Sequence, residues 1–127
     1  MEDPPRWLAS YGEVPHHLAY PDCSLYDAIM ATVRRLPDAV AYEFLGATVT
    51  YREFGQCIDQ VADGLAALGL RAGDRLTIAL PTSPQGVIAF YAALRLGAVC
   101  AMIHPLSTAP EVERLLHRSE EDLVEAV

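Results

Sequence analysis

The sequence predicts an α/β fold, in which a partial doubly wound, mostly parallel sheet carries flanking helices and a short β-hairpin. From residue 50 onward, segments with helical spacing of apolar residues alternate with short runs typical of strands. Such alternation favours right-handed crossovers between parallel strands. The run 98–103 is apolar without a break, as expected for a strand covered on both faces of a parallel sheet. With 127 residues, 52% of them hydrophobic, the chain can bury a core.

Residues 1–23 are predicted to form an extended N-terminal arm. Prolines recur along this segment and oppose regular helix or strand. We expect the arm to lie over a surface and to be held there by the apolar side chains between the prolines, which are Trp7, Leu8, Tyr11, Leu18 and Tyr20.

A first helix is predicted to begin after Ser24. The Ser24 hydroxyl can cap the first turn, and Asp27 places a negative charge near the positive end of the helix. Thr32 lies on the apolar face, where its hydroxyl can bond to a carbonyl one turn earlier. The sequence Pro37-Asp38 ends this helix.

The segment 40–50 is typical of a hairpin, because two alternating runs rich in β-branched and aromatic residues flank a turn at residues 45–47. Thr50 and Glu53 have the spacing of a capping box, in which each side chain bonds to the backbone N–H of the other residue. The helix that follows ends at Gly69, and residues 69–74 form a tight connection.

Alternating residues at 75–80 predict a parallel strand. Ser83 can cap the next helix, Pro84 suits its first position, and Gly97 follows its end. That helix is apolar on most of its circumference, so we expect it to be buried on more than one side. After the strand at 98–103, Thr108 and Glu111 form another predicted capping box.

The final segment, residues 119–127, is acidic where a third buried strand would be expected. We therefore predict a subdomain at 24–118, followed by an acidic tail or an interrupted continuation of the fold. Two parallel strands and a hairpin leave an exposed sheet edge, which favours pairing with another chain. A homodimer through this edge is one expected partner interaction.

Charge and cysteine content narrow the function classes. The net charge is −8 and the chain has no lysine, which excludes the clustered basic surface that nucleic acid requires. The three cysteines show no disulfide or zinc spacing, and the N-terminus lacks the features of a signal peptide. We therefore predict a cytoplasmic protein with reduced thiols. The adjacent His16 and His17 have no third ligand spaced to complete a metal site.

One residue stands out as a candidate for ligand contact. His104 follows the carboxyl end of the apolar strand, the edge at which open α/β sheets bind ligands. The alternative is a loop histidine that bonds to backbone groups before Pro105. Glu53 and Asp74 have sufficient structural explanations as a cap and a turn residue. No glycine-rich phosphate loop and no nucleophile elbow occur in the sequence.

From residue 24 to about residue 116 the chain resembles the N-terminal region of adenylate-forming enzymes, the family of acyl-CoA synthetases, peptide-synthetase adenylation domains and luciferases. The resemblance rests on three stretches in order: 49–54, with its Thr-Tyr-x-Glu pattern; 69–76, a Gly-Asp turn; and 90–99 followed by His104-Pro105-Leu106. The residues after Pro105 resemble fatty acyl-CoA and aryl-CoA ligases more than peptide synthetases.

The resemblance implies an α/β subdomain of the acyl-CoA synthetase-like fold and a parent enzyme that uses ATP, Mg²⁺ and coenzyme A. In such enzymes a carboxylate attacks the α-phosphate of ATP, and coenzyme A thiol then displaces AMP. The family's catalytic motifs lie downstream of the matched region, so no catalytic, cofactor-binding or metal-binding residue transfers to this chain.

Two functions remain open at this stage. The chain can be the N-terminal fragment of an ATP-dependent fatty acyl-CoA ligase, inactive alone, whose partners are the remainder of the enzyme with its fatty acid, ATP and coenzyme A. Alternatively, it can be a stand-alone small α/β module for binding or oligomerisation.

Overall fold

The computed structural model describes residues 5–118 and 123–126. Within these ranges no helix is both long and apolar enough to cross a lipid bilayer. The described elements, in chain order, are a 3₁₀ helix η1 (Arg6–Tyr11), α1 (Leu25–Arg35), β1 (Val40–Phe44), β2 (Ala47–Thr50), α2 (Tyr51–Ala67), β3 (Arg75–Ile78), α3 (Pro84–Arg95), β4 (Val99–Met102), α4 (Ala109–Arg118) and β5 (Leu123–Ala126).

The main sheet is parallel and has the strand order β4-β3-β5. Leu76 pairs with Cys100 on one side and with Val124 on the other. This arrangement corrects the expectation that the parallel sheet holds only two strands, because β5 supplies the third from within the acidic segment. Acidic residues flank a short β-prone sequence there, and pairing with the buried strand β3 outweighs their low strand propensity.

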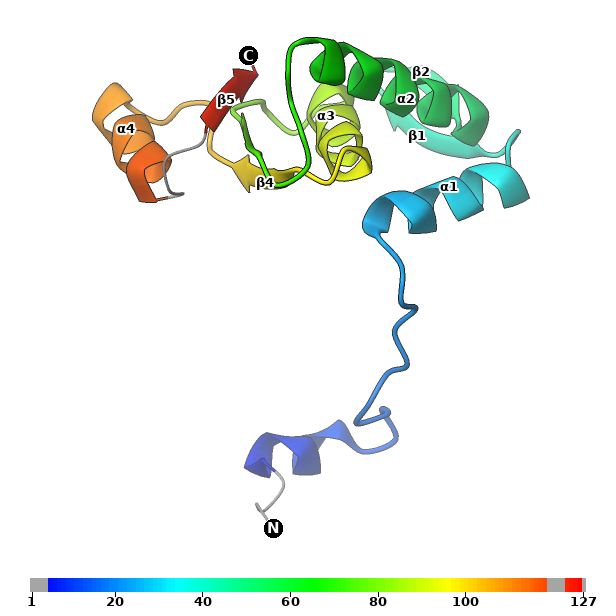
Figure 1. The fold of residues 1–127 in the computed structure, drawn as a ribbon. Coiled ribbons are helices and arrows are strands. Elements are labelled where there is room, and N and C mark those ends of the chain that lie inside the picture. The colour runs from blue at the N-terminus through cyan, green and yellow to red at the C-terminus, as the bar shows by residue number, and fades with distance from the viewer. Residues whose placement is uncertain (1–4, 119–122, 127) are drawn as a thin grey trace.

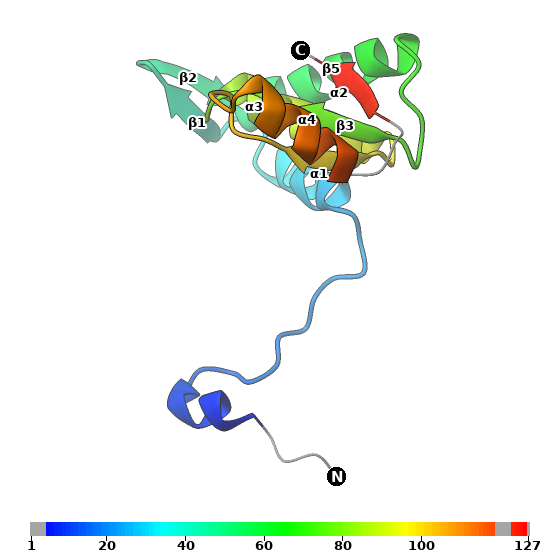
Figure 2. The same cartoon turned by 90° about the vertical axis from the view of Figure 1, so that its left-hand side faces the viewer.

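Helices lie on both sides of this sheet, as the doubly wound prediction requires. Helices α2 and α3 lie on one side, and α4 lies on the other (Figures 1 and 2). The main core forms on the α2–α3 side, where Leu76 and Ile78 of β3 are almost fully buried. Alanines on both helices allow them to approach each other and the strand; the core cluster comprises Ala62, Leu65, Leu70, Leu76, Ile78, Ala92, Ala93 and Ala98.

The predicted caps form. The Ser24 and Thr50 hydroxyls accept from the amides of Asp27 and Glu53 at 3.0 and 3.3 Å, and both capping boxes are reciprocal. The Glu111 carboxylate accepts from the Thr108 amide at 2.8 Å. Because each cap satisfies backbone donors that helix geometry leaves free, helix starts are set by local sequence.

The hairpin also forms, with β1 antiparallel to β2 and Phe44 paired with Ala47. Leu45 and Gly46 occupy the turn with φ of 52° and 82°. Two positive φ values in succession match the tight turn whose twist suits a two-residue hairpin.

Strand β4 is less covered than its sequence predicts. Val99 and Met102 are 52% and 56% exposed, whereas Cys100 packs against the core. The reason is position: β4 is the edge strand of the sheet, so helices and neighbouring strands cover it only in part. The expectation of a strand covered on both faces was therefore wrong for β4.

The N-terminal arm differs from its prediction in two ways. Residues 6–11 form a 3₁₀ helix, and the arm projects away from the body rather than lying over it (Figures 1 and 2). Its aromatic contacts are local, since the Trp7 ring meets Tyr11 at 5.4 Å. Pro5 precedes the first turn, which explains why a short helix can begin in a proline-rich segment.

A polar network joins the first three α-helices. The Arg95 guanidinium on α3 donates to the Asp63 carboxylate at 2.8 Å and to the Asp59 carbonyl at 3.0 Å. The Tyr26 hydroxyl on α1 donates a hydrogen bond to the Asp59 carboxylate at 2.8 Å. The single charge that interrupts the apolar run of α3 thus has acidic partners on α2.

Candidate functional site: the crevice between β3 and β4

The connections after β3 and β4 lead to opposite sides of the sheet. The chain leaves β3 for α3, and it leaves β4 for α4, which lies on the other face (Figure 2). In open α/β sheets, ligands bind at the carboxyl ends of the strands, the edge from which both of these connections start.

The structure has a cavity of ≈ 530 Å³ at this position. Its walls come from the two diverging loops, one after β3 and one after β4. We call it the strand-end crevice, and its lining residues are Leu80, Pro81, Thr82, Ile103, His104, Pro105 and Leu106. A cavity of this size is within the usual range for small-molecule sites.

His104 lies in the wall of the crevice, and it also makes the backbone hydrogen bonds expected of a loop histidine before Pro105. Its Nδ1 accepts from the Leu106 amide at 3.1 Å, and its carbonyl accepts from the Ser107 amide at 3.0 Å. Because Nδ1 is an acceptor, the neutral ring carries its proton on Nε2. The turn therefore fixes the ring and leaves one hydrogen-bond donor for a ligand.

The lining of the crevice has no Lys, Arg, Asp or Glu. Its polar side chains are the Thr82 hydroxyl and the His104 imidazole, and the others are apolar. Phosphate recognition requires cationic side chains or converging backbone donors, so this lining suits an uncharged part of a ligand with one or two hydrogen-bonding groups.

A second hollow continues the crevice along α3. It measures ≈ 430 Å³ and shares Leu80, Pro81 and Thr82 with the crevice. Phe90 and Met102 form its far wall. An apolar ligand in the crevice thus has room to extend over the first turns of α3.

The other candidates from the sequence lie elsewhere. The Glu53 carboxylate accepts from the Thr50 amide at 2.8 Å, and the Asp74 carboxylate accepts from the Arg71 amide at 2.7 Å. His16 contacts Tyr11 edge-on within the arm. None of them lines the crevice.

The described residues include no group of three or more His, Cys, Asp or Glu side chains that could hold a metal ion. Cys100 offers no reactive thiolate either, because burial raises the pKa of its thiol and its Sγ lies 3.7 Å from the Phe90 carbonyl.

Sequence reasoning missed the loop after β3 as a wall of the site. Pro81 and Thr82 fall between the strand predicted at 75–80 and the helix capped by Ser83, and the sequence analysis assigns them no role. The signal that could have found them is topological: the loop must face the one after β4 once β3 and β4 are paired.

These observations define a class of protein, the doubly wound α/β domain with a cavity at the carboxyl ends of its parallel strands. The model of the AMP-binding enzyme family matches residues 29–124, which is most of the chain. The chain therefore belongs to the AMP-binding enzyme family.

Individual relatives come from more than one branch. The chain is 31% identical over 125 residues to the long-chain-fatty-acid–CoA ligase of Bacillus subtilis, covering 98% of this chain and 22% of that protein. It is 32% identical over 96 residues to the phosphinothricin tripeptide synthetase PhsC of Streptomyces viridochromogenes, covering 76% of this chain and 9% of that protein.

Among solved structures, the N-terminal subdomain of Klebsiella oxytoca NpsA in complex with 3-hydroxyanthranilyl-AMSN superposes with a TM-score of 0.76 at 26% identity. The match covers 80% of this chain and 26% of that one. This confirms the predicted fold class. The chain spans about a fifth of the length of the Bacillus ligase that it matches.

Proposed function

We propose that this chain forms the N-terminal part of a cytoplasmic, ATP-dependent fatty acyl-CoA ligase and is inactive alone. The observation that supports this choice is the extent of the match. Similarity to the Bacillus long-chain ligase covers 98% of the chain, so it includes the arm, whereas similarity to the peptide synthetase PhsC covers 76%.

In this proposal the strand-end crevice contacts an uncharged part of the substrate or of coenzyme A. The His104 Nε2–H and the Thr82 hydroxyl bond to an amide or carbonyl, while Leu80 and Ile103 pack against apolar atoms. ATP with Mg²⁺ supplies the activation of the carboxylate, through residues outside this chain. The residues of this chain orient the bound part of the ligand and exclude water from the crevice.

The inactivity of the chain alone is tested by incubating it with ATP, magnesium, fatty acids and labelled pyrophosphate. We expect no exchange above the rate without protein. Robust exchange by the isolated chain would contradict the proposal, because it would require catalytic residues within these 127 positions.

Parentage and the crevice are tested together in a chimera, in which this chain replaces the matching 125 residues of the Bacillus ligase. We expect the chimera to form acyl-CoA. His104→Ala in the chimera should lower kcat/KM about tenfold, since it removes one ligand hydrogen bond, and His117→Ala on α4 is the matched control. A chimera that folds but forms no thioester argues against the ligase assignment.

The second candidate is a stand-alone α/β module. Two observations support it. Side chains of this chain cap the first turns of α1, α2 and α3, and one hydrophobic cluster surrounds Leu76 and Ile78. Cooperative unfolding of the isolated chain would favour this candidate, and aggregation of the isolated chain would count against it.

A further inference from the structure

The histidine in the wall of the strand-end crevice is bonded to its own turn. The Leu106 amide donates to His104 Nδ1 at 3.1 Å, and the Ser107 amide donates to the His104 carbonyl at 3.0 Å. The first bond requires a lone pair on Nδ1, which only the neutral ring has. In the imidazolium form both ring nitrogens carry a proton, so neither can accept. The crevice wall therefore contains a hydrogen bond that one proton can break.

The start of the same loop is held by a bond that does not titrate. The Ile103 amide donates to the Ile78 carbonyl at 3.1 Å, directly after the last paired residues of β3 and β4. Both partners of this bond are backbone groups. Release of the Leu106 amide would thus loosen the turn at residues 104–107, while the sheet edge from which the turn starts stays in place.

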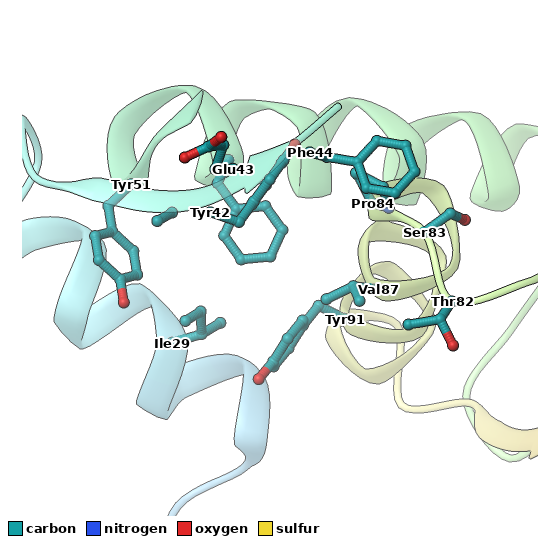
Figure 3. Close-up of a pocket in the computed structure, with 12 residues that line it drawn as sticks. Ile29, Tyr42, Glu43, Phe44, Tyr51, Thr82, Ser83, Pro84, Val87 and Tyr91 are labelled. Atoms are coloured by element: carbon teal, nitrogen blue, oxygen red, sulfur yellow. The ribbon is translucent and has the colours of Figure 1, made fainter. Parts of the chain in front are cut away.

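The crevice offers no opposite charge to a protonated His104. The ring is exposed, so a proton can reach it, and the facing loop contributes Thr82, an uncharged hydroxyl. Thr82 also borders a separate pocket, whose carboxylate, Glu43, lies on the hairpin across that pocket (Figure 3). The hollow along α3 adds one titratable side chain, the phenol of Tyr91. The described lining of the crevice thus has no carboxylate that could hold an imidazolium ring in the position of the neutral one.

The charged side chains of α4, the next element along the chain, have contacts of their own. The Glu111 carboxylate accepts from the Thr108 amide and hydroxyl at 2.8 and 3.0 Å. Glu113 lies 3.9 Å from His117, one turn further along the helix. The described lining of the crevice includes none of the charged or titratable residues of α4, which are Glu111, Glu113, Arg114, His117 and Arg118.

We propose that His104 is a pH switch in the wall of the strand-end crevice. The neutral ring holds the turn at residues 104–107 and directs Nε2–H as a donor. Protonation removes the acceptor, the Leu106 amide turns to water, and the ring leaves its fixed position. Because a proton added to Nδ1 would point at another N–H group, the two states cannot share one geometry.

The switch changes what the crevice presents to a ligand. In the neutral state a fixed donor suits a carbonyl group, and in the protonated state the same wall holds a mobile positive charge. This consequence for binding rests on the ligand role proposed above for the crevice. The switch itself is measured in the chain without any ligand, so its failure and the failure of the ligase proposal are separate results.

NMR of the ¹⁵N-labelled chain follows both partners of the bond in one titration, from pH 8 to pH 5, the range in which histidines change charge. We expect the Nε2–H tautomer of His104 at pH 8. The exchange protection of the Leu106 amide, corrected for the intrinsic effect of pH, should then fall about tenfold with the same midpoint as the ring. The Ile103 amide should keep its protection. An Nδ1–H tautomer at pH 8, or a Leu106 amide that does not follow the ring, overturns the proposal.

One substitution separates the proton from the turn. His104→Asn supplies a side-chain oxygen that can accept from the amide two residues on and cannot ionise, so the Leu106 amide should stay protected from pH 8 to pH 5. His117→Asn on α4 is the matched control: it removes another exposed histidine and should leave the Leu106 response as in the wild type. A Leu106 response that persists in His104→Asn, or that disappears in His117→Asn, would assign the switch to another group and contradict the proposal.

Discussion

The amide of Gly73 donates to the carbonyl of Gly97 at 3.0 Å, which joins the turn before β3 to the end of α3. Gly97 has φ of +76°, and a Cβ atom built there would lie 3.2 Å from the Cβ of Ala72. The Asp74 carbonyl then accepts from the Val99 amide at 2.8 Å, where pairing of β3 with β4 begins. Two glycines in separate family motifs thus serve one contact that sets the register of the sheet.

Gly97→Ala should lower the free energy of unfolding by about 1–2 kcal/mol, because a side chain disfavours the left-handed backbone and Ala72 must also move. Urea titration measures the change. Gly64→Ala is the control: it lies within α2 with no atom within 4 Å of the added Cβ. That substitution should stabilise by roughly 0.5–1 kcal/mol. Equal effects at the two sites would contradict this account.

Acid should weaken the fold through the capping boxes. Hydrogen bonds from the Thr50 backbone and hydroxyl lower the pKa of Glu53 below its ordinary value of 4.5, and Thr108 does the same for Glu111. A depressed carboxyl pKa stabilises the folded state at pH values above the unfolded pKa, and this stabilisation is lost as pH falls through the folded pKa.

The test compares unfolding free energies across this acidic range. Glu53→Gln keeps an acceptor for the cap and cannot ionise, so we expect a shallower dependence of stability on pH than in the wild type. Glu43→Gln, on the hairpin, is the control and should leave the slope unchanged. A wild-type slope in Glu53→Gln would show that the cap is not the titrating element.

The network around Asp59 predicts opposite shifts at Tyr26. Burial raises the pKa of the Tyr26 hydroxyl, the hydrogen bond to Asp59 raises it further, and the Arg95 charge lowers it. Asp59→Asn should therefore lower this pKa, and Arg95→Met should raise it. NMR titration of the Tyr26 ring, assigned with Tyr26→Phe, follows both. Arg52→Met, which removes the exposed pair with Asp38, should leave Tyr26 unchanged.

Local signals explain which elements the sequence could predict. The capping boxes at Ser24 and Thr50 and the hydrogen bond from the Thr108 amide to Glu111 involve residues three positions apart, so the sequence alone defines them. The site was predictable only as far as His104, since its place after an apolar strand indicates a sheet edge. The facing wall at Thr82 depends on the pairing of β3 with β4, which no local pattern contains.

Long-range effects account for the differences. Strand β5 pairs with β3 although acidic residues surround it in the sequence. The exposure of Val99 follows from an edge position that strand order decides. Gly55 gave no signal either, although a Cβ there would lie 3.0 Å from the Val33 side chain, so its absence of a side chain allows α1 to approach α2.

The hairpin turn offers a stabilising substitution. Leu45 has φ of 52° and is 92% exposed, so it bears the cost of a left-handed backbone without a packing gain. Leu45→Asn should stabilise by about 1 kcal/mol, because asparagine adopts this conformation more readily and precedes Gly46 in the preferred turn sequence. Thermal unfolding measures the gain. Ala47→Asn, at the first residue of β2, is the control and should destabilise slightly, since asparagine is depleted in strands. Destabilisation by Leu45→Asn would contradict this account, because it would show that the backbone cost at position 45 does not depend on the residue type. The pairing of Phe44 with Ala47 would then set the twist of the hairpin.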